Sequence, residues 1–197
     1  MKLRGLYAIT PEGPDVMQKV QQALEGGITL LQYRRKGFSR EFLLQEAKQM
    51  HQLAQRHQVP FIVNDDVELA LALGADGVHL GRDDGDLAAA RKKMKAKLVG
   101  ASCYNRLDLA QAALAAGADY IAFGSVFSSP TKPAAVRAPL SLFKNDLQVP
   151  LCAIGGITLQ NAPQAIAAGA DMVAVISDLF DAPDIARQAA AYRKLFQ

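Results

Sequence analysis

The sequence contains no tryptophan, only two cysteines and only three histidines in 197 residues. Cys103 and Cys152 lie far apart and do not have the spacing of metal ligands, and we do not expect a structural disulfide. Cys152 lies in an apolar run and is expected in the core. The first apolar run ends within a few residues at Pro11, which is too short for a signal peptide or a membrane span. The sequence therefore predicts a cytoplasmic protein that does not enter a membrane.

The protein is only slightly basic. Charged residues make up 21% of the chain and hydrophobic residues 50%, as in ordinary soluble globular proteins. A net charge of +3 suits a small anionic ligand but is too weak to indicate nucleic acid as a partner. The length favours a single domain over residues 1–197, with no linker or low-complexity segment.

A repeated Gly-Ala-Asp triplet organises the chain at 74–76, 117–119 and 169–171. Each triplet follows a stretch rich in alanine and leucine and precedes a short apolar run, as expected where glycine ends a helix before a strand. Eight such apolar runs are strand candidates: 5–10, 29–34, 60–64, 77–81, 98–102, 120–126, 151–156 and 172–177. Apolar strands alternating with helices indicate a parallel sheet covered by helices. At about 25 residues per unit, the pattern predicts an α/β fold, a single-domain (β/α)₈ TIM barrel, with an open doubly wound sheet as the alternative.

Active sites of such barrels lie at the carboxyl ends of the strands. The second predicted strand ends in "QYRRK", residues 32–36, which places three cations in a row at such an end. Guanidinium and ammonium groups suit a polyanion such as pyrophosphate. The alternative is a solvated loop before the next helix.

The third predicted strand ends in "FIVNDD", with Asn64, Asp65 and Asp66 at its end. Asp65 lies three residues before Glu68, the spacing of a capping box, and either aspartate is suited to cap the following helix. Considered alone, these acids indicate helix capping.

The fourth predicted strand leads into "GRDDGD", in which Asp84 lies 19 residues after Asp65. The two carboxylates therefore occupy equivalent ends of neighbouring strands, which are about 4.8 Å apart. Beside a basic cluster, such a pair is suited to share Mg²⁺, which keeps several waters and bridges substrate phosphates. The pair is more informative than either acid alone.

The later strand ends offer polar groups that are individually weak signals. Ser102 ends the fifth strand, and the irregular segment 128–139 carries hydroxyl groups, cations and three prolines, as in lid loops. Glycines at 155–156 and the pair at 176–177 end the last two strands, where many barrels bind phosphate. His79 lies inside a strand and is expected to be a hydrogen-bonded barrel residue rather than a general base.

Together these segments resemble the thiamine-phosphate synthase family over almost the whole chain. The matching motifs are "GLYAIT", "QYRRK", "VNDDVELALALGADGVHLGRDD", "GASCYN", "GADYIAFGSVFSSPTK", "AIGGIT" with Asn161, and "VAVIS". The resemblance implies an enzyme that joins a hydroxymethylpyrimidine diphosphate to a hydroxyethylthiazole phosphate, or its carboxylate, and releases pyrophosphate.

The resemblance also implies roles for particular residues. It implies one Mg²⁺ per subunit on Asp65 and Asp84. It implies pyrimidine diphosphate binding by Gln32, Tyr33, Arg34, Arg35, Lys36, Asn64, Ser102 and Lys132, with Arg34, Lys36 and Lys132 acting in catalysis. It implies thiazole phosphate binding by Ser129, Pro130, Thr131, Gly156, Ile176 and Ser177.

Three features depart from the common family pattern. Ser129 stands where a threonine is frequent, Arg82 where glutamine is frequent, and the pair Cys103-Tyr104 replaces a segment that often contains histidine. Two other functions remain open: a thiazole tautomerase built on the same barrel, and a non-catalytic regulator that binds a phosphorylated ligand. The sequence also leaves open a homo-oligomer.

Overall fold

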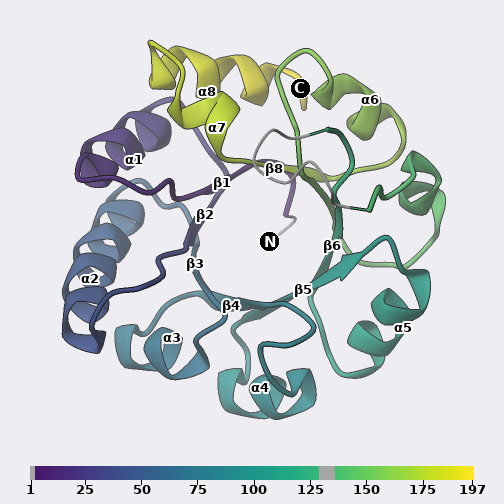
Figure 1. Cartoon of the computed structure of the whole chain (residues 1–197), viewed down its shortest axis with the longest axis horizontal. Helices are drawn as coiled ribbons and strands as arrows, with labels where there is room; N and C mark the ends of the chain where they lie inside the picture. The colour runs from purple at the N-terminus through teal and green to yellow at the C-terminus, as the bar shows by residue number, and fades with distance from the viewer. Residues whose placement is uncertain (1–2, 129–135) are drawn as a thin grey trace.

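The computed structural model describes residues 3–128 and 136–197, in which eight parallel strands close into a barrel (Figure 1). The strands pair in chain order, and β8 returns to β1. Their bounds are β1 Gly5–Ile9, β2 Leu30–Tyr33, β3 Phe61–Asn64, β4 Gly77–Leu80, β5 Leu98–Tyr104, β6 Tyr120–Gly124, β7 Leu151–Ile154 and β8 Met172–Val175. The predicted (β/α)₈ barrel is confirmed, and its closure excludes the open sheet.

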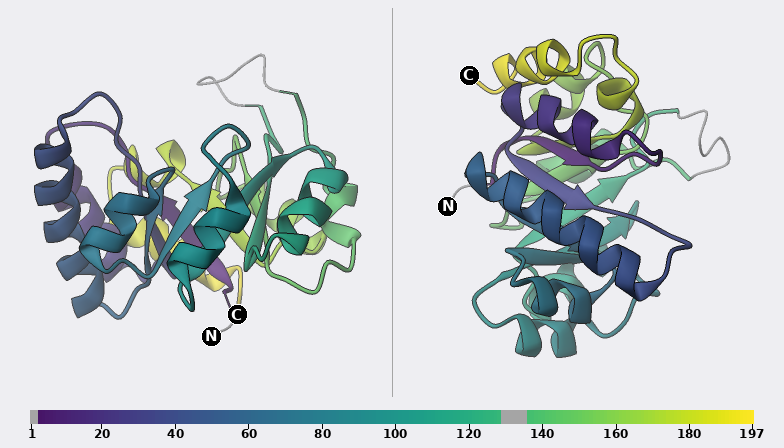
Figure 2. Two further views of the ribbon diagram at one scale, coloured as in Figure 1. Left: turned by 90° about the horizontal axis from the view of Figure 1, so that it is seen from below. Right: turned by 90° about the vertical axis from the view of Figure 1, so that its left-hand side faces the viewer.

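Helices form an outer ring around the strands (Figure 1). They are α1 Val16–Glu25, α2 Arg40–Arg56, α3 Val67–Leu73, α4 Leu87–Met94, α5 Leu107–Ala115, α6 Ala162–Ala167, α7 Ser177–Phe180 and α8 Ile185–Lys194. Between β6 and β7, the described residues contain only the short 3₁₀ helix η1, Leu140–Lys144. The start of β1 and the C-terminus lie on the same side of the barrel (Figure 2). No helix among the described residues is both long and apolar enough to cross a membrane.

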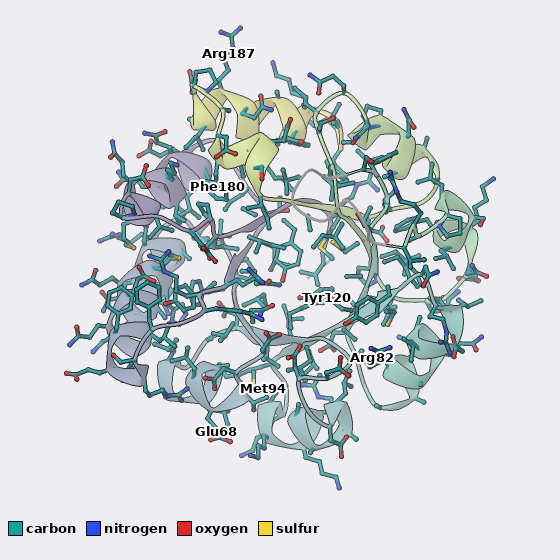
Figure 3. All side chains as sticks on the ribbon, in the orientation of Figure 1. Glu68, Arg82, Met94, Tyr120, Phe180 and Arg187 are labelled. Carbon is teal, nitrogen blue, oxygen red and sulfur yellow. The ribbon has the colours of Figure 1, made fainter. Side chains whose placement is uncertain are left out.

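Side chains alternate between the inside of the barrel and the layer under the helices. Tyr7, Leu30, Ile62 and Tyr120 belong to the buried inner cluster, whereas their strand neighbours pack against the helices. Figure 3 labels Tyr120 at the barrel wall. Both faces of each strand are therefore buried, which explains the nearly unbroken apolar runs. Cys152 is fully buried in the inner cluster, as predicted.

The repeated triplet has a structural role. Its glycines at 74, 117 and 169 have φ of +65°, +94° and +116°, in the left-handed region where glycine ends a helix at little cost. Its aspartates then hold the start of a neighbouring strand. Asp76 accepts a hydrogen bond from the Phe61 backbone N–H at 2.8 Å, and Asp119 accepts from Val99 at 2.7 Å. The repeat therefore joins each helix end to the sheet, away from the carboxyl ends of the strands.

Candidate active site

The ends of β3 and β4 bring the two predicted metal ligands together. The backbone N–H of Asp65 donates to the His79 carbonyl at 2.8 Å, which extends the pairing of β3 with β4 by one residue. Asp65 itself has φ of +64°, so the chain leaves strand geometry there and its side chain faces Asp84 instead of the helix layer. The Asp84 carboxylate is held by the Gly81 backbone N–H, which donates to Oδ2 at 2.9 Å. The predicted juxtaposition of Asp65 and Asp84 is present.

The two carboxyl groups strongly affect each other. Burial, a shared hydrogen bond with Asp84 and the like charge of Asp84 raise the pKa of Asp65 to about 6. Lys36 and Arg34 oppose this rise, and Lys36 Nζ lies 3.8 Å from Asp65 Oδ2. Without a cation beside it, Asp65 therefore keeps its proton to a higher pH than an ordinary aspartate does.

Helix capping belongs to a different residue. Asp66 is the N-cap of α3, because its Oδ1 accepts from the Leu69 backbone N–H at 2.7 Å, and its other oxygen pairs with Arg40. Glu68 pairs with Lys93 at 2.6 Å and takes no part in a capping box. The capping alternative for Asp65 is therefore wrong, and Asp65 remains available to a ligand.

Stability of the metal-free protein should depend on pH through Asp65. A carboxyl group whose pKa is higher in the folded than in the unfolded chain favours folding while it is protonated. The contribution is complete below about pH 4 and is lost as pH rises through about 6. Asp65→Asn removes this titration and suits the positive φ of the site. Thermal melts in a chelator between pH 4 and 7.5 should show a steeper loss of stability for the parent protein than for Asp65→Asn. Parallel curves would contradict the raised pKa.

The basic cluster after β2 divides into two groups. Lys36 is exposed at the site and close to Asp65, and the charge of Arg34 also acts on Asp65. Arg35 instead donates from Nη2 and Nε to Glu46 at 2.9 and 3.1 Å and from Nη2 to the Gly13 carbonyl at 3.1 Å. The Tyr33 hydroxyl donates to the same Glu46 at 2.8 Å. In this structure Tyr33 and Arg35 face the helix layer, because alternate residues of a strand point to opposite sides. Their polar groups bind within the protein here, and their contact with substrate stays a prediction.

Identical substitutions at neighbouring positions should separate these roles. The Arg35–Glu46 pair is largely buried, with side-chain exposures of 6% and 11%. Arg35→Met leaves Glu46 without its partner and should lower the free energy of unfolding by about 2 kcal/mol, between the values for exposed and buried pairs. Lys36→Met, at a side chain that is 62% exposed, should lower turnover and leave the melting temperature nearly unchanged. Melting curves and initial rates of both variants test this, and equal melting temperatures would contradict the structural role of Arg35.

Three more predicted residues share the inner face of the barrel. Gln32 pairs in register with Ile9 and Ile62, both of the inner cluster, and Asn64 lies two residues beyond Ile62. Ser102 lies two residues beyond Gly100, opposite the inward Tyr120 in the register of β5 with β6. Gln32 and Ser102 therefore face the same interior, and their contact with substrate stays a prediction.

A buried polar network connects Gln32 to Ser102, and the sequence patterns did not identify two of its five members, Tyr7 and Tyr120. Gln32 Nε2 donates to the Tyr7 hydroxyl at 2.7 Å, and the Tyr7 and Tyr120 hydroxyls are 2.8 Å apart. His79 lies 3.0 Å from the Tyr120 hydroxyl through Nδ1 and 2.8 Å from Ser102 Oγ through Nε2. Burial lowers the pKa of His79 to about 4, against the charge of Asp84. His79 is thus the satisfied barrel residue that was expected. Tyrosine at an inward position of an otherwise apolar strand was the signal that could have revealed this network.

The opposite rim is built by close backbone packing. A Cβ at Gly156 would lie 2.3 Å from the Ser128 carbonyl oxygen, so only glycine fits between the loops after β6 and β7. Asn161 holds this turn by donating to the Gly156 carbonyl at 2.8 Å. Ile176 and Ser177 are exposed at the end of β8. The other predicted residues of this rim, Ser129, Pro130, Thr131 and Lys132, lie outside the described residues.

Two departures from the common pattern meet at the rim beside the acidic pair. The Arg82 guanidinium lies over the Tyr104 ring, 5.6 Å from its centroid, and Arg82 also pairs with Asp83 at 3.3 Å. Cys103 is buried. Arg82 and Tyr104 therefore contact each other, and neither residue interrupts the contact between Asp65 and Asp84.

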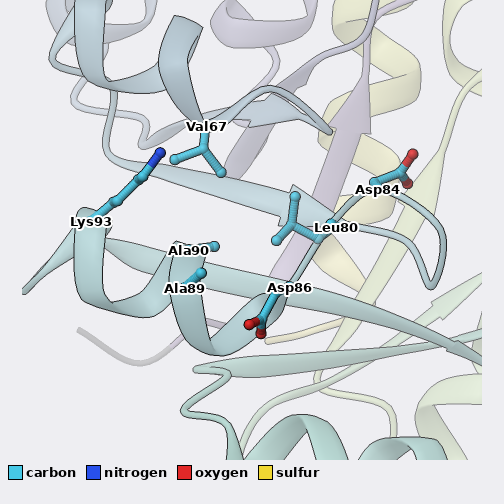
Figure 4. Close-up of a pocket in the computed structure, with 8 residues that line it drawn as sticks. Val67, Leu80, Asp84, Asp86, Ala89, Ala90 and Lys93 are labelled. Carbon is cyan, nitrogen blue, oxygen red and sulfur yellow. The ribbon is translucent and has the colours of Figure 1, made fainter.

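A pocket of about 170 Å³ lies behind the site, between α3 and α4. Val67, Leu80 and Lys93 line it, and Figure 4 shows the Asp84 carboxylate directed away from Lys93. The pocket lies on the helix side of the strands, and Asp84 borders it whereas Asp65 does not.

The residues at the carboxyl ends fit a magnesium ion. No group of three or more His, Cys, Asp or Glu suited to a metal occurs in residues 3–128 and 136–197, so the described protein supplies two carboxylates at most. Mg²⁺ commonly binds in this way, through one or two carboxylates, waters and substrate phosphates. The raised pKa of Asp65 indicates a pair that a cation would relieve.

Known proteins resemble this chain over its full length. A family model described as "Thiamine monophosphate synthase" matches residues 6–179. A "Thiamine-phosphate synthase" of Aromatoleum aromaticum is 57% identical, with 99% of this chain and 97% of the relative covered. One of Chromobacterium violaceum is 54% identical, with 96% and 95% covered. The solved "Thiamine phosphate pyrophosphorylase from Pyrococcus furiosus" has a TM-score of 0.89 and 33% identity, with 98% and 96% covered. These findings confirm the family that the motifs indicated: the chain belongs to the thiamine-phosphate synthase family.

Proposed function

We propose that this protein condenses hydroxymethylpyrimidine diphosphate with hydroxyethylthiazole phosphate, or its carboxylate, to form thiamine phosphate and pyrophosphate. Its family makes it a transferase. The observation that carries the proposal is the convergence of an acidic pair, Asp65 and Asp84, with Lys36 and Arg34 at the mouth of the barrel. Such a site suits a diphosphate that leaves with its charge neutralised.

Asp65 and Asp84 would hold one Mg²⁺ per subunit, and a bound Mg²⁺ would stabilise negative charge on the departing pyrophosphate. Lys36 and Arg34 supply positive charge at the same place. Because this charge lies beside the acidic pair before the reaction, it is placed to stabilise the developing charge.

The chain need not supply a covalent nucleophile. Both cysteines are buried, burial raises the pKa of Cys103 to about 12, and both ring nitrogens of His79 are hydrogen-bonded. In the proposed reaction the C–O bond to the diphosphate breaks first, and the electron-rich aminopyrimidine stabilises the methylene cation. The thiazole nitrogen then forms the new C–N bond. The protein therefore acts by binding charge and holding two rings in line.

The second phosphate would bind at the opposite rim. Gly156, Ile176 and Ser177 remain the proposed thiazole phosphate contacts there, together with Ser129, Pro130 and Thr131. Lys132 stays a proposed diphosphate and catalytic residue, as do the diphosphate contacts of Asn64 and Ser102. We also retain one catalytic domain over 1–197, a cytoplasmic location and small phosphorylated substrates as the partners, with a homo-oligomer left open.

One assay tests the proposed function and separates it from both rivals. Purified protein is mixed with both substrates and Mg²⁺, and thiamine phosphate and pyrophosphate are measured. We expect equal amounts of both products. Isomerisation of the thiazole phosphate alone would identify a tautomerase, and binding of the ligands without turnover would identify a regulator.

A further inference from the structure

Five side chains form a continuous hydrogen-bonded chain across the inside of the barrel. It runs from Gln32 on β2 through Tyr7 on β1, Tyr120 on β6 and His79 on β4 to Ser102 on β5, with successive separations of 2.7, 2.8, 3.0 and 2.8 Å. All but Ser102 are at most 7% exposed. We refer to these five residues as the interior chain.

The protons of the interior chain all point the same way. The Gln32 amide nitrogen is only a donor, so the Tyr7 oxygen accepts from it, and the single proton of Tyr7 is left for Tyr120. A Tyr120 oxygen that accepts from Tyr7 leaves its own single proton for Nδ1 of His79, 3.0 Å away. Each hydroxyl has only one proton to donate, so the orientation of one member determines the others.

A neutral His79 passes the direction of proton donation on to Ser102. Both ring nitrogens bind hydroxyl groups, no described carboxylate hydrogen-bonds either of them, and the side chain is 7% exposed. A neutral ring that accepts at Nδ1 carries its proton at Nε2, which donates to Ser102.

The two ends of the interior chain therefore have complementary roles. The Ser102 oxygen accepts from His79, so its own proton is left to donate to a ligand. The Gln32 nitrogen is turned inward, so Oε1 is left to accept, and it makes no hydrogen bond within residues 3–128 and 136–197. If every hydrogen bond of the interior chain were reversed, Ser102 would accept from a ligand and Gln32 would donate to it.

Tight packing keeps the interior chain in place. The Tyr120 ring occupies the space over Gly100, where a Cβ would lie 2.0 Å from Cζ and 2.3 Å from the hydroxyl oxygen. The same ring stacks on His79 with centroids 5.5 Å apart and meets Tyr7 edge to face at 6.0 Å. The phenols consequently have little freedom to change partners.

We propose that Tyr7, Tyr120 and His79 are positioning residues that couple the hydrogen-bonding roles of Gln32 and Ser102. An anion only accepts hydrogen bonds, so an anionic group bound at Ser102 requires the direction described above. That direction presents the Gln32 carbonyl, which binds an amino substituent on a ring and rejects an oxo substituent. The proposal rests on the proposed function, in which Gln32 and Ser102 bind the pyrimidine diphosphate.

Selectivity between two substrates tests the coupling. The probes are the aminopyrimidine diphosphate and its oxo analogue, and the quantity is the ratio of their kcat/KM values. Tyr7→Phe breaks the interior chain and should lower this ratio about 10-fold. Tyr120→Phe should do the same, and the double variant should lower the ratio no further, because the chain is already broken.

Tyr192→Phe is the matched control. Tyr192 is fully buried, and its hydroxyl donates to Asp178 at 2.6 Å outside the barrel. The control loses a buried tyrosine hydrogen bond and should keep the parental ratio. An unchanged ratio in Tyr7→Phe and Tyr120→Phe, with the parent protein active, would overturn the coupling. A parent protein that turns over neither pyrimidine would instead overturn the proposed function.

A spectroscopic measurement on the unmodified protein gives a second test that does not need turnover. With Mg²⁺ and inorganic pyrophosphate as the anionic probe, ¹⁵N NMR of the ring should show a neutral His79 protonated at Nε2. Protonation at Nδ1 in that complex would overturn the proposal even if the variants fail to fold.

Discussion

Asp84→Asn is expected to lower Mg²⁺-dependent turnover about 100-fold or more, the scale of losing one preorganised charge-stabilising group at a reacting centre. The substitution removes one of the two facing carboxylates, and Asp65 alone would hold the cation weakly. Half-maximal turnover should therefore need much more Mg²⁺. Initial rates against Mg²⁺ concentration measure this effect, and the rise in melting temperature on adding Mg²⁺ should disappear with it.

The fold of the Asp84→Asn variant should remain intact. An asparagine oxygen can still accept from the Gly81 backbone N–H, and the loss of one negative charge relieves the repulsion of Asp65. Without metal and above pH 6, the variant should be at least as stable as its parent. Asp83→Asn is the matched control, because Asp83 is 78% exposed and pairs with Arg82. Full turnover of Asp84→Asn at ordinary Mg²⁺ concentrations would contradict the assignment of Asp84 as a Mg²⁺ ligand.

Gly100→Ala is expected to have the largest effect on stability, a loss of about 4 kcal/mol. The added Cβ would lie 2.0 Å from Tyr120 Cζ, in a position where φ itself is unstrained, so the tyrosine must move. Overpacking a core costs roughly 1–3 kcal/mol. The displaced hydroxyl would also break its buried hydrogen bonds to Tyr7 and His79, each worth about 1 kcal/mol. Denaturant unfolding measures the difference.

Two controls separate crowding from other effects of the added methyl group. Gly74→Ala has nothing within 4 Å of the new Cβ but has φ of +65°, so it should cost about 1 kcal/mol from backbone strain alone. Combining Gly100→Ala with Tyr120→Leu should restore part of the lost stability, because the smaller side chain vacates the space. If Gly100→Ala were as stable as its parent, the position of the Tyr120 ring would be wrong.

Much of the fold was predictable because its signals are local. Each apolar run from 5–10 to 172–177 overlaps one observed strand, and the strand ends differ by at most two residues. The exception is the region after β6, where the expected helical stretch is only η1, Leu140–Lys144, among the described residues. Pro139 directly precedes η1, and proline cannot stand inside a helix without removing a hydrogen bond. The acidic pair was also predictable, since both residues follow the carboxyl ends of neighbouring strands, β3 and β4, which lie at one edge.

The basic cluster shows what strand direction adds to a list of residues. Alternation along β2 sends Gln32 to the interior but Tyr33 and Arg35 to the helix layer, where Glu46 binds them. The resemblance assigns residues 32–36 together to the diphosphate, and that assignment stays a prediction. Alternation adds that Tyr33 and Arg35 also have a structural partner in Glu46.

Local sequence determined the order of elements, the barrel class and the family motifs, because helix ends and apolar periods depend on neighbouring residues. Only the tertiary structure decided which acid caps α3, how Asp65 turns toward Asp84, and that Tyr7, Tyr120 and His79 join Gln32 to Ser102. These contacts connect residues up to 113 positions apart. No local pattern specifies them, because they depend on barrel closure, strand register and the space left by Gly100.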